Sequence, residues 1–110
     1  MDMAITHDQF KLIQAGTKTI EVRLNDAKRR ALRPGNHITF NDLEDGSRLR
    51  VAVAAIDHFP SFAALYTAYP GLQVGAAAHD SVAKMTKDTY QHYTPAQEQA
   101  NGVLAIHLAL

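Results

Sequence analysis

The chain has no cysteine and no tryptophan among its 110 residues. Without cysteine it can form no disulfide, no thiolate metal site and no cysteine nucleophile. Its formal net charge is zero, so we do not expect it to coat nucleic acid by bulk electrostatic attraction, which depends on neutralising many phosphates. The sequence also lacks an apolar run of membrane-spanning length and a secretion-type leader. We therefore expect a cytoplasmic protein without membrane association.

Motifs that would indicate a bound cofactor are missing as well. There is no Gly-rich phosphate loop, no Gly-x-Ser-x-Gly elbow and no dinucleotide fingerprint. The six histidines show no tight ligand spacing such as His-x-x-x-His, and His107 is expected to be hydrogen-bonded rather than metal-bound. We predict neither a metal nor another cofactor. With 46% hydrophobic residues, residues 1–110 are expected to form one domain around a single core.

Short strands and short helices are predicted to alternate along the chain. Strands are expected over 3–5, 19–24, 38–42, 48–56 and 103–110, and helices over 7–15, 62–69, 81–90 and from 95 onward. Asp45-Gly46 is a strong hairpin signal between two of these strands. The Gly/Ala-rich segment 71–79 shows no periodicity and is predicted to be a mobile loop. Because the last strand is apolar on both faces, the pattern favours an α+β fold with a small mixed barrel over a doubly wound sheet.

The strand over 19–24 is the most informative segment. Its residues alternate between apolar and polar, so one face should enter a core while the other carries a hydroxyl, a carboxylate and a guanidinium. The apolar face holds Ile20, Val22 and Leu24, and the polar face holds Thr19, Glu21 and Arg23. Lys18 stands at the entrance of the strand. This concentration of reactive groups makes the polar face a candidate site.

The chemistry of these side chains allows two interpretations. Lys18 and Glu21 could exchange protons as an acid/base pair at the mouth of a cleft, and Arg23 could bind a phosphate, a carboxylate or a base edge through its planar fork. Alternatively, Glu21 and Arg23 form an exposed ion pair of little energetic value, and Lys18 only extends along an apolar surface.

Basic and aromatic residues extend the candidate site. Between positions 18 and 33 there are six basic residues against two acids, including the run Lys28, Arg29 and Arg30. This run either holds phosphates of an anionic ligand or forms the solvated face of a turn. Tyr90 and Tyr93 are candidates for stacking on a nucleobase, whereas Tyr66 and Tyr69 are expected to pack in the core.

Residues 16–23 read Gly-x-Lys-x-x-Glu-x-Arg, and a basic turn over 28–30 and the segment 32–40 follow. Together with 61–66, 93–99 and 102–106, this pattern resembles the ASCH (activating signal cointegrator homology) domain of the PUA-like superfamily, in particular the small stand-alone bacterial proteins. The resemblance covers nearly the whole chain. It implies a PUA-like β-barrel with short helices flanking a ligand cleft, into which Thr19, Glu21 and Arg23 would point.

What the resemblance implies about activity carries over only in part. Some small bacterial ASCH proteins remove the acyl group from acetylcytidine, and others are described as ribonucleases or RNA-binding proteins. In the amidohydrolases the lysine that matches Lys18 accepts a proton and a threonine three positions later is the nucleophile, but here that position is Glu21. The later acidic proton donor has no clear match, Asp80 being the nearest carboxylate.

Three hypotheses about function therefore stay open. The first is binding of single-stranded or structured RNA, or of a modified nucleoside, in a basic cleft lined by Lys18, Thr19, Glu21 and Arg23. In the RNA case Lys18, Arg23 and the run 28–30 would hold phosphates and a tyrosine would stack on a base. The second is a small hydrolase, either amidohydrolase or ribonuclease, with Lys18 and Glu21 as acid/base groups. The third is a protein-interaction domain. The sequence does not distinguish the substrates, predict an oligomeric state, or tell whether segment 71–79 closes over a ligand.

Overall fold

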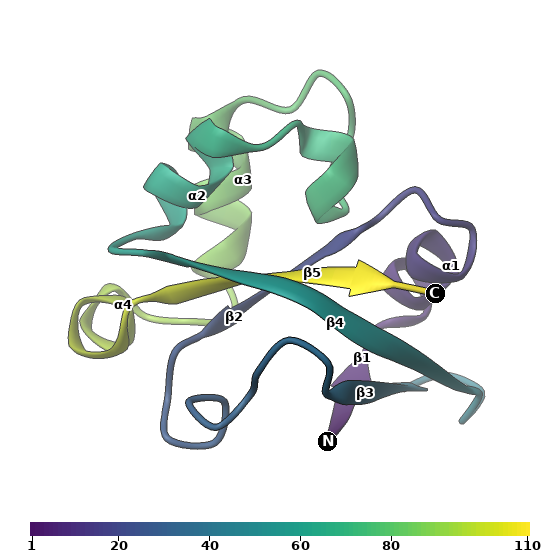
Figure 1. Ribbon diagram of the computed structural model, residues 1–110. Helices are drawn as coiled ribbons and strands as arrows, with labels where there is room; N and C mark the ends of the chain where they lie inside the picture. Colours follow the sequence, from purple (N-terminus) through teal and green to yellow (C-terminus); the bar gives the residue numbers. More distant parts are fainter.

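A five-stranded mixed sheet organises the computed structural model, which describes residues 1–110. The strands are β1 (Asp2–Ile5), β2 (Ile20–Leu24), β3 (His37–Asp42), β4 (Arg48–Phe59) and β5 (Val103–Ala109). Their order in the sheet is β1-β3-β4-β5-β2, with β1 and β3 parallel and all other neighbours antiparallel. The sheet curls into a half-barrel that leaves β1 and β2 as its two edges (Figure 1). The predicted α+β barrel architecture and the hairpin at Asp45-Gly46 are confirmed.

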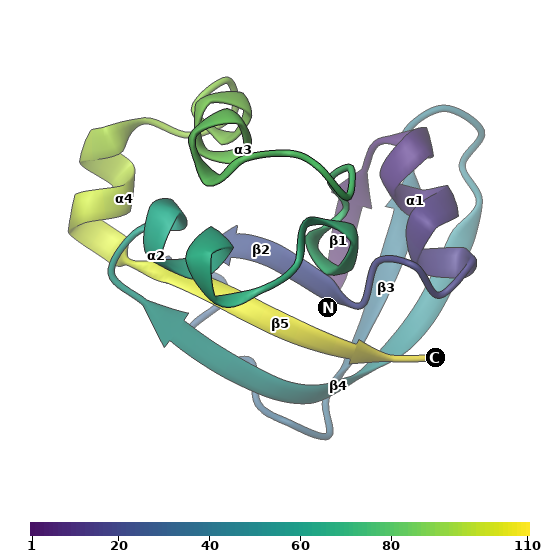
Figure 2. The same cartoon turned by 90° about the horizontal axis from the view of Figure 1, so that it is seen from above.

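Four short α-helices and one 3₁₀ helix surround the sheet. They are α1 (His7–Gln14), α2 (Phe62–Ala68), the 3₁₀ helix η1 (Gly71–Val74), α3 (Val82–Thr89) and α4 (Pro95–Asn101). Ser61 and Ser81 cap the N-termini of α2 and α3, and Thr94 and Gln97 form a capping box at α4. Seen from above, α2 and α3 lie together over one end of the sheet and α1 lies beside β1 and β3 (Figure 2). No helix combines the length and the apolar character needed to cross a membrane.

Two hydrophobic clusters lie on opposite faces of β5. Leu104 and Ile106 join the first, with side chains from α1, β1, β3 and β4. Val103 and Ala105 join the second, with side chains from β2, α2, η1 and α3. The prediction that the last strand is buried on both faces is therefore confirmed, although the expected single core is divided into two parts by this strand.

Two predicted elements differ from the structure. Segment 71–79, expected to be a mobile loop, begins with the helix η1, whose Gly71 and Val74 are buried. A Cβ at Gly71 would lie 2.6 Å from the carbonyl oxygen of Ala77, so this turn packs too closely for a side chain. The sequence did not predict this 3₁₀ helix because a single buried valine creates no periodic pattern. Strand β4 also continues beyond its predicted end to Phe59, because its last residues pair with β5.

Candidate functional site

The candidate site lies at the open side of the half-barrel, between the edge strands β1 and β2. Glu21 pairs with Ile106 and Arg23 pairs with Leu104, and paired residues point to the same face of a sheet. The polar face of β2 is therefore turned toward the first hydrophobic cluster, while Ile20, Val22 and Leu24 face the second. Arg23 Nη2 donates a hydrogen bond to the Ala4 carbonyl at 3.0 Å and so links the two edge strands. The predicted alternation of β2 is confirmed.

Glu21 is the centre of a buried row of charges. Its Oε1 accepts a hydrogen bond from Lys18 Nζ at 2.8 Å, and its Oε2 accepts two from Arg23, at 2.8 Å from Nη2 and 3.1 Å from Nε. The Lys18 and Glu21 side chains are each only 5% exposed, and that of Arg23 is 15% exposed. The interpretation of Glu21 and Arg23 as an exposed surface ion pair is therefore wrong. Buried ions need this degree of hydrogen bonding to offset the loss of hydration.

The environment of Glu21 sets its charge state. Burial raises the pKa of this carboxyl, but the Lys18 and Arg23 charges and their hydrogen bonds outweigh burial and lower the pKa below its usual range. Burial likewise lowers the pKa of Arg23, and the Glu21 charge reverses that effect and raises it. Glu21 is therefore ionised at neutral pH. As a weak base with both oxygens occupied, it is better suited to holding the two cations than to removing a proton from water.

This row forms part of the wall of a cavity of about 650 Å³. The cavity is bounded by α1 and β1 on one side, β2 at its base, and α2, η1 and α3 on the other side. Its charged lining comprises the carboxylates of Asp8, Glu21, Asp80 and Asp88 against the two cations Lys18 and Arg23. The predicted basic cleft is therefore corrected: carboxylates outnumber cations, and both cations are already bound to Glu21.

Only some of the predicted contact residues reach the cavity. Lys18, Glu21, Arg23 and Tyr93 line it, and the Tyr93 ring stacks on Phe62 with centroids 5.6 Å apart. The residues predicted to contact a ligand that lie outside the lining are Thr19, Tyr90, Lys28, Arg29 and Arg30.

Three of these outlying residues make local contacts outside the cavity. Thr19 is exposed just before β2, where its backbone bonds to Gln73 and Leu108. Tyr90 instead donates its hydroxyl to Glu98 Oε1 at 2.6 Å. Arg29 pairs with Asp26 at 2.6 Å, in the turn that separates β2 from β3.

Gln9 is a site residue that the sequence did not reveal. Its Oε1 accepts a hydrogen bond from Lys18 Nζ at 2.8 Å, and its Nε2 donates to the Gly75 carbonyl at 3.0 Å. Gly75 has a φ of 89°, and a Cβ there would collide with Gln9 Oε1. Gln9 thus fastens the segment after η1 over Lys18. In the sequence, Gly75 was the only sign of this contact, because nothing near Gln9 distinguishes it from an ordinary exposed glutamine of a helix.

Two histidines, at separate places in the structure, each lie beside a carboxylate from a distant part of the sequence. His7 Nδ1 lies 2.7 Å from Asp42 Oδ2, and ligand atoms of His7, Asp42 and Asp45 lie within 4.8 Å of one another, close enough to hold a cation. Each of these carboxylates also accepts a backbone N–H of the β3–β4 turn. His107 Nε2 lies 2.8 Å from Asp57 Oδ2, as expected for a hydrogen-bonded histidine. The first group fastens α1 to the hairpin, and neither group lies in the cavity lining.

The curled sheet with helices flanking an open edge defines the chain as a PUA-like α+β domain. The family model described as "ASCH domain" matches residues 3–110, and the chain belongs to this family. Two solved structures are similar over 97% of the chain. The crystal structure of the hypothetical protein PH0355, from Pyrococcus, has a TM-score of 0.83 and 33% identity, with 94% of that chain covered. The NMR structure of protein PF0455 from Pyrococcus furiosus has a TM-score of 0.74 and 31% identity, with 93% covered. No curated protein matches the sequence.

Proposed function

We propose that this ASCH domain binds RNA or a modified nucleoside and that the nucleobase or nucleoside occupies the cavity. The observation that carries the proposal is the buried row of Lys18, Glu21 and Arg23 in the wall of a cavity of about 650 Å³. That volume is in the range of small-molecule sites, about 300–1,000 Å³. The row offers hydrogen-bond donors and acceptors side by side, and ASCH domains are generally associated with RNA binding.

The charge of the lining favours an uncharged group in the cavity. Lys18 and Arg23 are both bound to Glu21, so neither cation is free to neutralise a phosphate. Asp8, Asp80 and Asp88 add negative charge to the wall, although Lys84 pairs with the last two. A neutral base can instead exchange hydrogen bonds with these groups and pack against Tyr93, since a base presents polar edges and an apolar face.

Hydrolysis is the second candidate function. It is favoured by one observation: Lys18 Nζ lies 2.8 Å from both Glu21 Oε1 and Gln9 Oε1 in the cavity wall, which fixes a potential proton donor in one position. However, the position of the family's nucleophilic threonine is occupied by Glu21. Hydrolysis by this chain would therefore require attack by water, with Lys18 and Glu21 relaying protons.

The proposal is tested by calorimetric titration with a panel of unmodified and acylated nucleosides and with short single-stranded RNAs. Mass spectrometry of each mixture after incubation detects any product. Lys18→Met removes the ammonium but leaves Glu21 paired with Arg23, and Lys11→Met on the exposed face of α1 is the matched control.

We expect wild type and Lys11→Met to bind one class of nucleoside and Lys18→Met to bind it at least tenfold more weakly. If wild type and Lys11→Met convert a substrate to product and Lys18→Met does not, the result would support hydrolysis as the function. If neither nucleoside nor RNA binds, the cavity proposal fails and the protein-interaction hypothesis takes its place.

A further inference from the structure

The cations that make no ion pair are unevenly distributed over the molecule. Of the eleven lysines and arginines, six have no carboxylate within salt-bridge distance. They are Lys11, Lys28, Arg30, Arg33, Arg50 and Lys87. Lys11 lies on α1 and Lys87 on α3, whereas the other four belong to the β2–β3 connection and the adjoining part of β4. We call Lys28, Arg30, Arg33 and Arg50 the basic surface.

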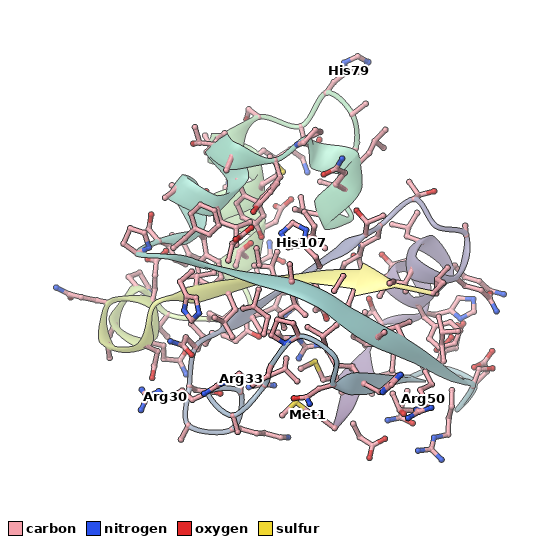
Figure 3. The ribbon with its side chains drawn as sticks, viewed as in Figure 1. Met1, Arg30, Arg33, Arg50, His79 and His107 are labelled. Carbon is pink, nitrogen blue, oxygen red and sulfur yellow. The ribbon has the colours of Figure 1, made fainter.

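A hydrogen bond joins Arg33 to the backbone of Arg30, and Arg50 lies farther along the same side of the molecule (Figure 3). Arg33 Nη1 donates to the Arg30 carbonyl at 2.6 Å and to the Leu32 carbonyl at 2.9 Å. Leu32 and Arg50 line a shallow hollow of about 440 Å³. Arg30, Arg33 and Arg50 are exposed and lie on the side of the sheet away from α2 and α3 (Figure 3). All three therefore present guanidinium groups along one side of the molecule.

The basic surface begins close to where the candidate site ends. Arg30 Nε donates to the Asn25 carbonyl at 3.2 Å, so the Arg30 side chain lies at the end of β2. Asn25 is two residues beyond Arg23 in the sequence, and two residues of extended chain span about 7 Å. The β2 edge thus leads directly from the cavity wall to the first arginine of the surface.

The two regions have complementary charge character. The cavity wall holds more carboxylates than cations, whereas Asp26, the carboxylate nearest the basic surface in sequence, is paired with Arg29. Unpaired guanidinium groups are planar forks that match phosphate oxygens. A ligand with a neutral base and a negatively charged backbone would therefore separate these two parts between the two regions.

We propose that the basic surface binds the phosphodiester backbone of a single-stranded RNA that places one base in the cavity. This inference rests on the proposed function and extends it to a second, separate contact region. A single strand is favoured because a base inside a duplex must first be unstacked and unpaired before it can enter a cavity, whereas a base of a single strand is already accessible. The role predicted for Lys28 and Arg30 is thereby placed outside the cleft, and Arg33 and Arg50 are added to it.

The test measures the salt dependence of RNA binding by fluorescence anisotropy with a labelled single strand of about ten nucleotides, within the site sizes of single-strand binding domains. Four phosphate contacts predict a slope of log affinity against log salt of about −3, and each lost contact reduces its magnitude by about 0.7. The variants are Arg33→Gln and Arg50→Gln, alone and combined. Lys11→Gln and Lys87→Gln are the controls, since each removes an exposed unpaired cation elsewhere.

We expect the combined arginine variant to bind more weakly and with a slope near −1.5, while both lysine variants keep the wild-type slope. An unchanged slope in Arg50→Gln and in the combined variant would overturn the inference, as would equal losses in the lysine controls. The exposed Arg50 side chain makes no hydrogen bond or ion pair within the protein, so its substitution separates RNA contact from local folding.

Failure of the inference is distinguishable from failure of the proposed function. If nucleosides bind in a Lys18-dependent manner but RNA binds no more tightly than its nucleoside, binding in the cavity is supported and RNA binding at the basic surface is refuted. If RNA binds through the arginines but Lys18→Met changes nothing, RNA binding at the basic surface is supported and binding in the cavity is refuted.

Discussion

Glu21→Gln is expected to be among the most destabilising conservative substitutions in this chain. The change removes the charge that balances Lys18 and Arg23, both largely buried, and replaces one acceptor oxygen by an amide nitrogen that can only donate. Removing one partner of a buried ion pair typically costs about 3–5 kcal/mol, because an uncompensated charge is left behind. At several degrees per kcal/mol, the melting temperature of a domain of this size should fall by roughly 10–20 °C.

The assay is urea unfolding followed by circular dichroism at neutral pH, with Glu44→Gln as the matched control on the exposed β3–β4 turn. The double variant Lys18→Met/Glu21→Gln should recover part of the loss, since one of the two stranded cations is then absent. A loss of less than about 1 kcal/mol in Glu21→Gln would refute the reasoning, because this is the value of an exposed pair. It would mean that water reaches the row in solution.

The pH dependence of stability has a definite sign. The folded-state pKa of Glu21 is lowered, so its contribution is fully present above its unfolded value of about 4.3 and is lost as pH falls toward the folded value. Wild type should therefore lose more stability than Glu21→Gln when the pH is lowered through 4. Parallel curves for the two proteins would contradict the assignment of a lowered pKa.

Three further predictions concern the surroundings of the site. Gly75→Ala should destabilise the fold by about 1–2 kcal/mol in urea unfolding, because φ is 89° there and the added Cβ meets Gln9; a neutral effect would show that segment 71–79 moves freely. Thr94→Ala removes the side-chain half of the capping box with Gln97 and should cost about 1 kcal/mol, whereas Thr94→Ser should cost less than half of that. Burial and the Asp57 carboxylate raise the pKa of Tyr69 to about 12. In an ultraviolet titration of tyrosine ionisation, the step at the highest pH should therefore be absent from Tyr69→Phe; an unchanged titration curve would contradict this.

Local patterns in the sequence predicted the elements well because the causes of those elements are local. The caps at Ser61 and Thr94 and the alternation along β2 depend on residues at most four positions apart. The alternation also showed that Glu21 and Arg23 share a face. It did not show that this face turns inward, because that depends on pairing with β5, about eighty residues later in the sequence.

The composition of the site was harder to predict. Position along the chain suggested that Lys28 and Arg30 would join Lys18 and Arg23, but the strand β2 carries the basic turn away from the cavity. Asp88 reaches the cavity from α3 and Asp80 from the segment just before it, both more than fifty residues away in sequence. Their contribution reversed the expected charge of the lining. The sign of the net charge that lines a cleft depends on which residues the fold brings together, so it cannot be inferred from one charged stretch of sequence.

The contact between Arg23 and the Ala4 carbonyl has a mechanical consequence. Strands β1 and β2 face each other across the open side of the half-barrel without a backbone ladder, and the Arg23 side chain bridges them by its hydrogen bond to the Ala4 carbonyl. A guanidinium can move between acceptors by rotating a few side-chain bonds, whereas separating paired strands would break several hydrogen bonds at once. The width of the entrance can therefore change without unfolding any strand. Rotation of the Arg23 side chain can therefore admit ligands of different size while the hydrogen bonds of the sheet stay intact.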